Sequence, residues 1–314
     1  MARKRVVPPG LKTEYPQRLA DQLARKYGAL NQHALDLIDQ YLIPAIAADD
    51  DVAIALAIKT IETELEQAWP DSRIEGIARS TAKVQNNSQQ KRWKKALGVA
   101  LGVAIIGNEN PLRGSLPTEP KPKPGKQQTY AINISVTPEL YADEFVAQNV
   151  KYIGELRKGI VPGLEDAVVR ARQFGVPGVR GEGPEELARR LRGIWAKNGV
   201  PAQLPTTRLK ANGQPVMLST SKHALMVAED QLAKLHSNIQ QSLQDASGIV
   251  SYTWETRQDS KVREAHRVLQ GQILTWQSGG APGQGHPGQS PRCRCISAPV
   301  LDRDQILRRL VPLR

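Results

Sequence analysis

Residues 219–256 contain first a helical and then a strand-like spacing of apolar residues, and this stretch constrains the fold more than any other. Apolar residues recur at three- and four-residue intervals from Leu225 to Ala246, which is the spacing of an amphipathic helix. Gly248 follows where a helix C-terminal cap is expected. Apolar and polar residues then alternate in IVSYTWET, residues 249–256, as in a strand with one buried face. The sequence therefore predicts a long helix that leads directly into a β-strand.

The residues after this strand predict the rest of a small mixed domain. Asp259 is placed to cap a short helix that continues through His266. Residues 271–276, GQILTW, are typical of a second strand, and a loop rich in glycine and proline occupies residues 277–292. Residues 293–301 are expected to return as a third strand.

The first half of the chain is expected to be helical. Apolar stripes at residues 19–42 and 52–69 have helical spacing, and a third helix is expected from Asp71 past Trp93. Pro44 and Pro70 are expected to interrupt these helices. The aromatic content is only 4%, so the cores must depend on Leu, Ile, Val and Ala.

Between the two halves the pattern predicts further short elements, which are a strand at residues 130–136, helices at 138–160, 164–174 and 183–194, and a loop at 200–218. The predicted fold class is mainly α, with a small α+β C-terminal domain in which helices precede a short antiparallel sheet. The predicted organisation is a basic arm (1–15), a helical N-terminal domain (16–107), a linker rich in Pro, Gly and Lys (108–128), a second domain (129–301) and a basic tail (302–314).

The charge of the chain favours a polyanionic partner. The net charge is +12, and phosphate contacts made by basic residues release condensed counterions. A solvated surface without a partner is the competing interpretation of such charge. The residues that we single out for nucleic-acid contact are Lys91, Arg92, Lys94 and Lys95, which surround Trp93, together with Lys261 and Arg267. No apolar segment approaches the roughly 20 residues that span a bilayer, and the basic start lacks the apolar core of a secretory signal. We therefore expect a protein that is made in a cytoplasm and has no membrane partner.

Residues 222–300 resemble the Mu F-like phage head morphogenesis family in the order and spacing of their motifs, and a weaker resemblance extends to about residue 130. The matching residues are Asp230, Gln231, Lys234 and Leu235 on the helix; Gly248, Ile249, Tyr252, Trp254 and Thr256 around the strand; Asp259, Val262, Arg263, His266 and Gly271 after it; and Cys293, Arg294 and Cys295 near the end. Residues 1–128 are not covered by the resemblance.

The resemblance implies a minor head protein that is present in few copies per virion, in the head interior or at the portal vertex. Its expected partners are the portal protein, the major capsid protein or inner capsid surface, and the double-stranded DNA genome, bound without sequence preference. It carries over no catalytic residues, so we expect no enzyme. Two alternatives stay open. One is a metal-dependent nuclease or hydrolase that uses His266, His286, Asp259 and the cysteines, and the other is an assembly factor absent from the mature virion.

The two cysteines, Cys293 and Cys295, are one residue apart, so a disulfide between them would be strained. Many relatives resemble a zinc knuckle, with a Cys-x-x-Cys at the positions of Arg263 and His266 here and a histidine close to the C-R-C. In this chain the loop histidine is His286. Cys293, Cys295, His266 and His286 together would make a chemically sensible structural zinc site. The competing interpretation is two small buried cysteines and a histidine that hydrogen-bonds locally.

Overall fold

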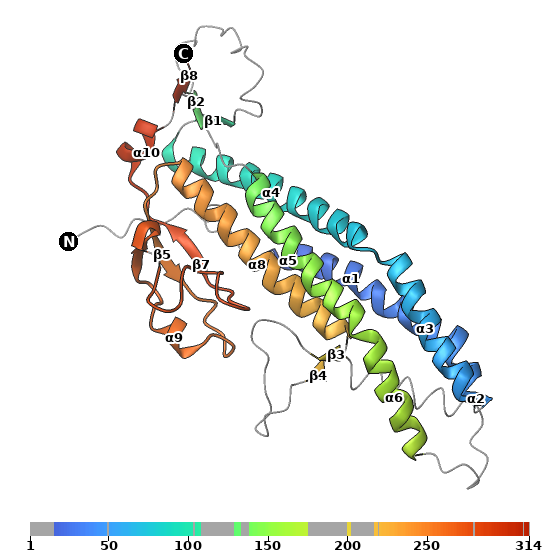
Figure 1. Cartoon of the computed structure of the whole chain (residues 1–314). Coiled ribbons are helices and arrows are strands. Elements are labelled where there is room, and N and C mark those ends of the chain that lie inside the picture. Colours follow the sequence, from blue (N-terminus) through green and yellow to red (C-terminus); the bar gives the residue numbers. More distant parts are fainter. Residues whose placement is uncertain are drawn as a thin grey trace. The chain divides into compact units, whose positions relative to one another are not determined.

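The structure of the chain, a computed structural model, is mainly helical and carries a small antiparallel sheet near its C-terminus, as the sequence predicted (Figure 1). It describes residues 16–48, 50–102, 104–107, 129–132, 138–174, 200–201, 217–218, 220–278, 280–309 and 311–313. The predicted basic arm, the linker at 108–128 and the helix at 183–194 lie outside these ranges. Among the described helices, none combines the length and the apolar character needed to cross a membrane.

The chain divides into two compact units, and we call residues 17–81 and 144–231 the helical unit. Its elements are α1 (Gln17–Leu37), the π-helical turn η2 (Ile38–Leu42), α2 (Ile43–Ala47), α3 (Asp51–Ala68), the start of α4 (Asp71–Leu101), most of α5 (Pro138–Lys158), α6 (Ile160–Phe174), the short strands β3 (Val200–Pro201) and β4 (Met217–Leu218), and the start of α8 (Thr220–Ala246).

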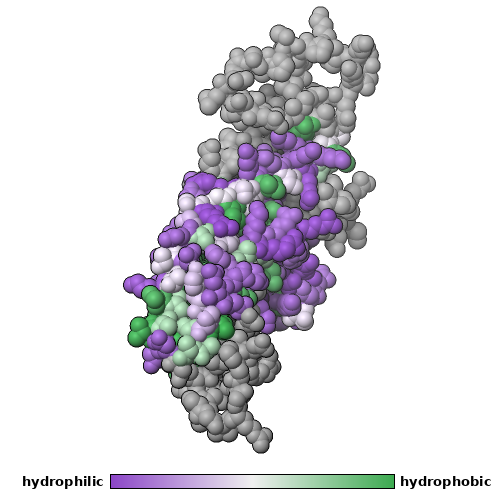
Figure 2. All heavy atoms as spheres, turned by 90° about the vertical axis from the view of Figure 1, so that its right-hand side faces the viewer, coloured by the Kyte–Doolittle hydropathy of each residue, from purple (hydrophilic) through white to green (hydrophobic). Residues whose placement is uncertain are grey.

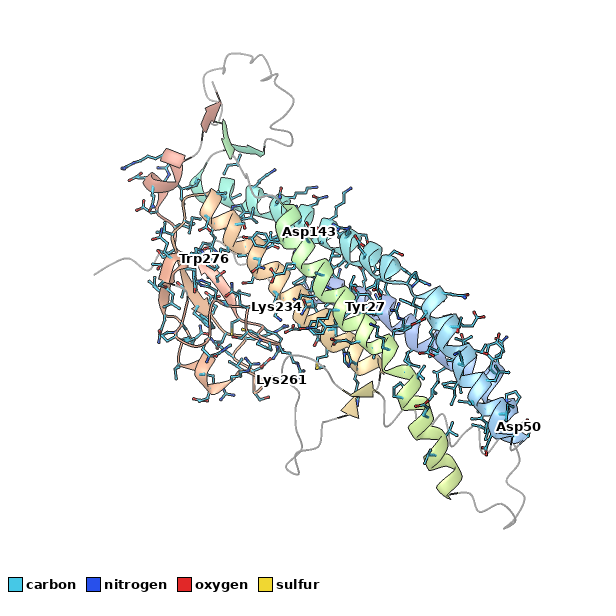
Figure 3. All side chains as sticks on the ribbon, in the orientation of Figure 1. Tyr27, Asp50, Asp143, Lys234, Lys261 and Trp276 are labelled. Atoms are coloured by element: carbon cyan, nitrogen blue, oxygen red, sulfur yellow. The ribbon has the colours of Figure 1, made fainter. Side chains whose placement is uncertain are left out.

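The core of the helical unit comes from the apolar stripes recognised in the sequence. Its largest fully buried side chains are Leu23, Tyr27, Leu30, Ile38, Leu42, Ile61, Leu65 and Trp69. The Tyr27 hydroxyl donates a hydrogen bond of 2.9 Å to Asn149 Oδ1 on α5, so the one polar atom of this ring is satisfied inside the core (Figure 3). Asp50 caps α3 by accepting hydrogen bonds from two backbone N–H groups of its first turn, at 2.9 and 3.1 Å.

The second unit, which we call the sheet unit, contains the described residues within 82–143 and 232–314. Besides the remaining parts of α4 and α8, its elements are β1 (Ala104–Gly107), β2 (Thr129–Ile132), β5 (Ser251–Glu255), α9 (Glu264–Arg267), β6 (Ile273–Thr275), the 3-10 turn η3 (Trp276–Ser278), β7 (Ile296–Pro299), α10 (Arg303–Arg309) and β8 (Val311–Leu313). One sheet has the order β6-β5-β7 and is antiparallel throughout; another has the order β1-β2-β8.

In the sheet unit, α4 packs against α8 through buried polar side chains. Gln89 Nε2 donates to Gln240 Oε1 and to the His236 carbonyl oxygen, both at 3.1 Å. One turn further along, Trp93 Nε1 donates to Ser247 Oγ at 3.0 Å. Because the partner numbers rise together on both helices, these segments run parallel. We call this set the polar seam. Its residues are Gln85, Gln89 and Trp93 of α4, His236 and Gln240 of α8, and Ser247 directly after α8.

Several local predictions differ from the structure. Pro44 lies in the first turn of α2, and the helical path continues through it because this turn needs no N–H from the proline. Asp259 does not cap α9, whose N-cap residue is Arg263. Within the predicted loop at 200–218, β3 pairs with β4.

The ends of the predicted domains also contain structure that sequence periodicity missed. β1 lies at the end of the predicted helical domain, and the predicted C-terminal tail contributes α10 and β8. The predicted domain boundaries themselves stay predictions, since the linker on which they depend lies outside the described residues.

Candidate functional site

The β6-β5-β7 sheet is built around the alternating strand that the sequence indicated. Tyr252 and Trp254 are fully buried, which confirms their predicted place in the core of the small domain. The core that they form also contains Leu269, Trp276, Ala281, Cys293 and Cys295. Gly271 leads into β6 with a positive φ of 77°, which favours glycine, and its N–H donates to the Trp254 carbonyl oxygen. The family motif residues of this region are therefore mostly framework residues.

A cluster of one histidine and two cysteines lies in this core. His266 Nδ1 is 3.4 Å from Cys293 Sγ and 3.5 Å from Cys295 Sγ, and all three side chains are buried. One ligand atom from each residue lies within 4.8 Å of the other two, which makes this a group that could hold a metal ion. His266 comes from α9, and the cysteines immediately precede β7. Three of the four predicted metal ligands are thus brought together.

The fourth predicted ligand, His286, is not part of this cluster. Its Nδ1 atom is 2.8 Å from the Tyr252 hydroxyl, and its ring packs against Trp276 with centroids 4.8 Å apart. Burial lowers the pKa of His286. The loop thus directs His286 to the phenol of Tyr252 and not to the cysteines, so the structure brings together only three of the four predicted ligands.

Hydrogen bonds around the cluster determine which atoms face its centre. His266 Nε2 lies 2.9 Å from Gln284 Oε1, and because this oxygen only accepts, Nε2 is the protonated nitrogen. A neutral His266 therefore directs the lone pair of Nδ1 towards the two sulfur atoms. The Gly288 N–H donates to Cys293 Sγ at 3.4 Å. Neither Gln284 nor Gly288 was identified from the sequence; the only signal was their place in the Gly/Pro-rich loop.

The three groups also shift one another's ionisation. A hydrogen bond from the Cys295 thiol lowers the pKa of Cys293 to about 4, and His266 adds to this effect. The same contact, together with burial, raises the pKa of Cys295. The hydrogen bond to Cys293 raises the pKa of His266. Cys293 is thus the cysteine of the pair that loses its proton more readily.

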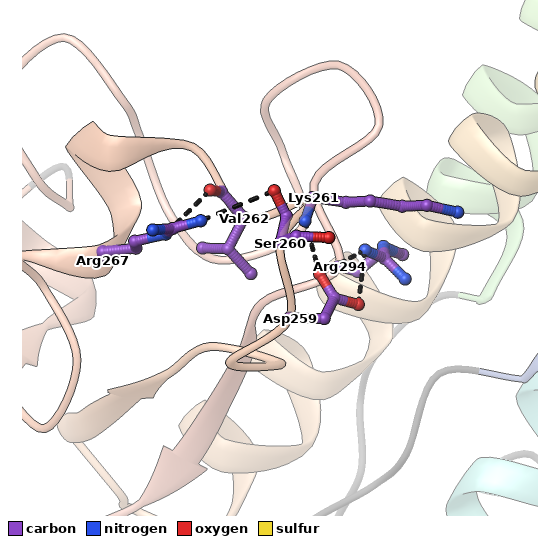
Figure 4. A network of polar contacts seen from close by, with 6 residues as sticks. All are labelled: Asp259, Ser260, Lys261, Val262, Arg267 and Arg294. Carbon is purple, nitrogen blue, oxygen red and sulfur yellow. Dashed lines mark hydrogen bonds and ion pairs between the residues drawn. The ribbon is translucent and has the colours of Figure 1, made fainter.

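A second set of polar contacts holds the chain on either side of the cluster (Figure 4). Both carboxylate oxygens of Asp259 accept hydrogen bonds from the Arg294 guanidinium, at 2.9 and 2.8 Å, and Asp259 Oδ1 also accepts from the Lys261 N–H. Arg263 donates to the carbonyl oxygen of Pro291. Because Arg294 lies between the two cysteines in the sequence, its ion pair with Asp259 fixes the direction of the C-R-C segment.

The predicted nucleic-acid contacts fall into two groups. On α4, Lys91, Arg92 and Lys95 are exposed and Lys94 is half-buried, while Trp93 is fully buried. None of these four cations forms an ion pair with a described residue, and α4 has no acidic residue after Glu75. On the face of the molecule in Figure 2, hydrophilic residues predominate over the described part.

The other two predicted contacts lie on the turn before α9 and on α9 itself. Arg267 donates to the carbonyl oxygens of Val262 and Ser260 and pairs with Glu264 at 3.7 Å, so its guanidinium supports the local turn. The Lys261 side chain is exposed and extends away from the Asp259 contact (Figure 4).

The remaining motif residues lie on α8. Asp230 and Gln231 are both buried, and Gln231 Nε2 donates to Asp230 Oδ2 at 2.8 Å. Sequence reasoning missed Gln244, which lies further along the same helix. Its side chain accepts from Trp276 Nε1 at 3.1 Å and donates to the Ser297 carbonyl oxygen at 3.0 Å, so it joins α8 to the sheet at two points.

Comparisons with known proteins find similarity in the region that contains α8 and the β6-β5-β7 sheet. The family model described as phage Mu protein F like protein matches residues 177–298. An uncharacterized protein of Haemophilus influenzae is 28% identical over 159 residues, which cover 51% of this chain and 29% of that protein. The chain thus matches less than a third of that relative's length. No solved structure matches the chain significantly. Residues 177–298, which include α8, the cysteine–histidine cluster and most of the β6-β5-β7 sheet, are thus similar to the phage Mu protein F like proteins.

Proposed function

We propose that this chain is a minor head protein of a tailed bacteriophage that acts in head morphogenesis near the portal. The family match over residues 177–298 carries this proposal. The structural roles of the motif residues support it. Tyr252 and Trp254 pack in the core, Asp259 forms an ion pair and Gly271 allows a turn, as expected for a structural protein. In this proposal the partners are the portal protein and the inner surface of the capsid.

Quantitative mass spectrometry of purified mature particles tests this role. We expect a few copies of the chain per particle, measured against portal and major capsid protein from the same digest. Procapsids isolated before DNA packaging serve as the matched sample. If the chain occurs in procapsids and is absent from mature particles, it is a transient assembly factor. If it is absent from both, the proposal of a head protein is wrong.

We further propose that α4 contacts the packaged genome through an exposed basic row. Lys83, Lys91 and Lys95 fall at multiples of four residues and are exposed, so they share one face of the helix, with Arg92 beside them. The rise from Lys91 to Lys95 is about 6 Å, so the row presents regularly spaced cations to a polyanion. Without local carboxylate partners, these cations can exchange solvent counterions for phosphate groups.

Binding to random-sequence duplex DNA between about 50 and 300 mM salt tests the basic row. The variant Lys91→Ala/Arg92→Ala/Lys95→Ala should bind more weakly and lower the slope of log affinity against log salt by about 1 for each phosphate that it no longer binds. A control that removes the same charge from the helical unit, Arg25→Ala/Lys26→Ala/Lys59→Ala, should keep the slope of the unmodified chain. Equal effects of both variants would mean that net charge alone drives binding and that the row is not a site.

A metal-dependent nuclease is the second candidate, and the cysteine–histidine cluster is the observation in its favour. The catalytic set that such an enzyme would use is not assembled here. Both oxygens of Asp259 are bound to Arg294, and His286 is bound to Tyr252. Metal-dependent cleavage of plasmid DNA that is lost in His266→Ala would nevertheless establish this activity.

A further inference from the structure

We propose that His266, Cys293 and Cys295 bind one Zn²⁺ ion through His266 Nδ1 and the two thiolate sulfur atoms, without His286. Tetrahedral bonds of about 2.0–2.3 Å separate neighbouring ligand atoms by about 3.5 Å. The two distances from His266 Nδ1 to sulfur, 3.4 and 3.5 Å, already have this value. The three side chains therefore need little rearrangement to surround an ion.

The hydrogen-bonding groups next to His266, Cys293 and Cys295 are those expected around a metal site. Metal-bound histidines usually donate their second N–H to an acceptor that fixes the ring, and the Gln284 oxygen has this place beside His266 Nε2. The Gly288 N–H already points at Cys293 Sγ. The indole N–H of Trp254, which lies in the same core cluster as Cys295, is buried without a hydrogen-bond partner among the described residues. Each donor would stabilise a thiolate, which is the form that binds metal.

The donor set selects the ion. Two sulfur atoms and one imidazole nitrogen suit zinc, whereas Ca²⁺ and Mg²⁺ require oxygen ligands. Within the described residues no carboxylate joins the cluster. A recess next to Cys293 and Cys295 is also lined by His236, Ser237 and Gln240.

The ion would act as a crosslink within the small domain. It would join α9 to the start of β7 across 27 residues of chain, which include the Gly/Pro-rich loop. Gly288 holds this loop tightly against α8, because a Cβ atom at this position would come within 2.8 Å of Ser237 Cβ. The ion would thus add stability where short strands and a long loop bury little apolar surface. This inference does not depend on whether the chain resides in a phage head.

Metal analysis of the full chain tests the site directly. The protein is stripped of metal with a chelator under reducing conditions, incubated with Zn²⁺, passed through gel filtration and analysed by elemental mass spectrometry. We expect one zinc per chain, slower reaction of both cysteines with a thiol reagent, and a higher unfolding temperature than the stripped protein. Cys295→Ser and His266→Asn should lose the ion, with circular dichroism as the check on folding.

Two further variants separate a metal site from a merely structural cluster. Gln284→Leu leaves all three ligands in place and should weaken zinc affinity by about 10–100-fold. His286→Phe removes the loop histidine and should retain one zinc per chain. The proposal is overturned if the unmodified chain retains no zinc after gel filtration. The three-ligand assignment is overturned if folded His286→Phe loses the ion.

Discussion

At the scale of single residues, His223 stands apart from the other buried histidines. It lies on α8 in the helical unit with 1% of its surface exposed, and neither ring nitrogen has a hydrogen-bond partner in the described part of the chain. His236, His266 and His286 each have a polar partner for at least one ring nitrogen. Burial lowers the pKa of His223 below its ordinary value of 6.5, because the protonated form loses its hydration.

The stability of the chain should therefore depend on pH through His223. The unfolded chain takes up a proton at this residue more readily than the folded chain does, so the free energy of unfolding is highest above pH 6.5 and falls as the pH drops below it. In His223→Leu this contribution should disappear. Chemical denaturation at about pH 8 and about pH 5 should show a smaller loss of stability for the variant than for the unmodified chain. Equal losses would mean that His223 does not contribute to the pH dependence.

At the scale of elements, the polar seam is the least expected contact of the molecule. The buried face of α4 in the sheet unit carries glutamines where a helix of a globular protein usually carries apolar residues. Gln89 is 3% exposed and has three partners, since it accepts from Gln85 Nε2 and donates to His236 and Gln240. Such contacts specify the register of two helices more than they add to stability.

Replacing two members of the polar seam should cost less than the sum of the two single replacements. Gln89→Leu leaves polar atoms of its partners buried without a hydrogen bond and should lower the free energy of unfolding by about 1–3 kcal/mol. Gln89→Leu/Gln240→Leu should cost less than the sum of the single variants, because each removes a partner of the other. The exposed Asn87→Leu on the same helix is the control and should change stability by at most about 0.5 kcal/mol. Additive effects of the two glutamine variants would show that the seam is not a coupled network.

At the scale of the whole molecule, neither compact unit follows the order of the chain. Each unit combines segments from both sides of residues 108–128, and α4 and α8 contribute residues to both units. The contact from Gln85 to His236 spans 151 residues of sequence, and that from Trp93 to Ser247 spans 154. Contacts of such long sequence separation require the closure of long loops before they form, which favours slow folding.

The sequence alone determined the features that have a local period or a local steric cause. The apolar spacing of α8 and the alternation in β5 depend on near neighbours in the chain, and both were predicted correctly. The proximity of His266 to the two cysteines also followed from the motif. Only the tertiary structure decided that His286 binds Tyr252, that Gln284 fixes His266 and that α4 meets α8 through glutamines. The periodicity of a sequence carries no information about such contacts, because the two partners are far apart in the chain. They become neighbours only when the chain folds.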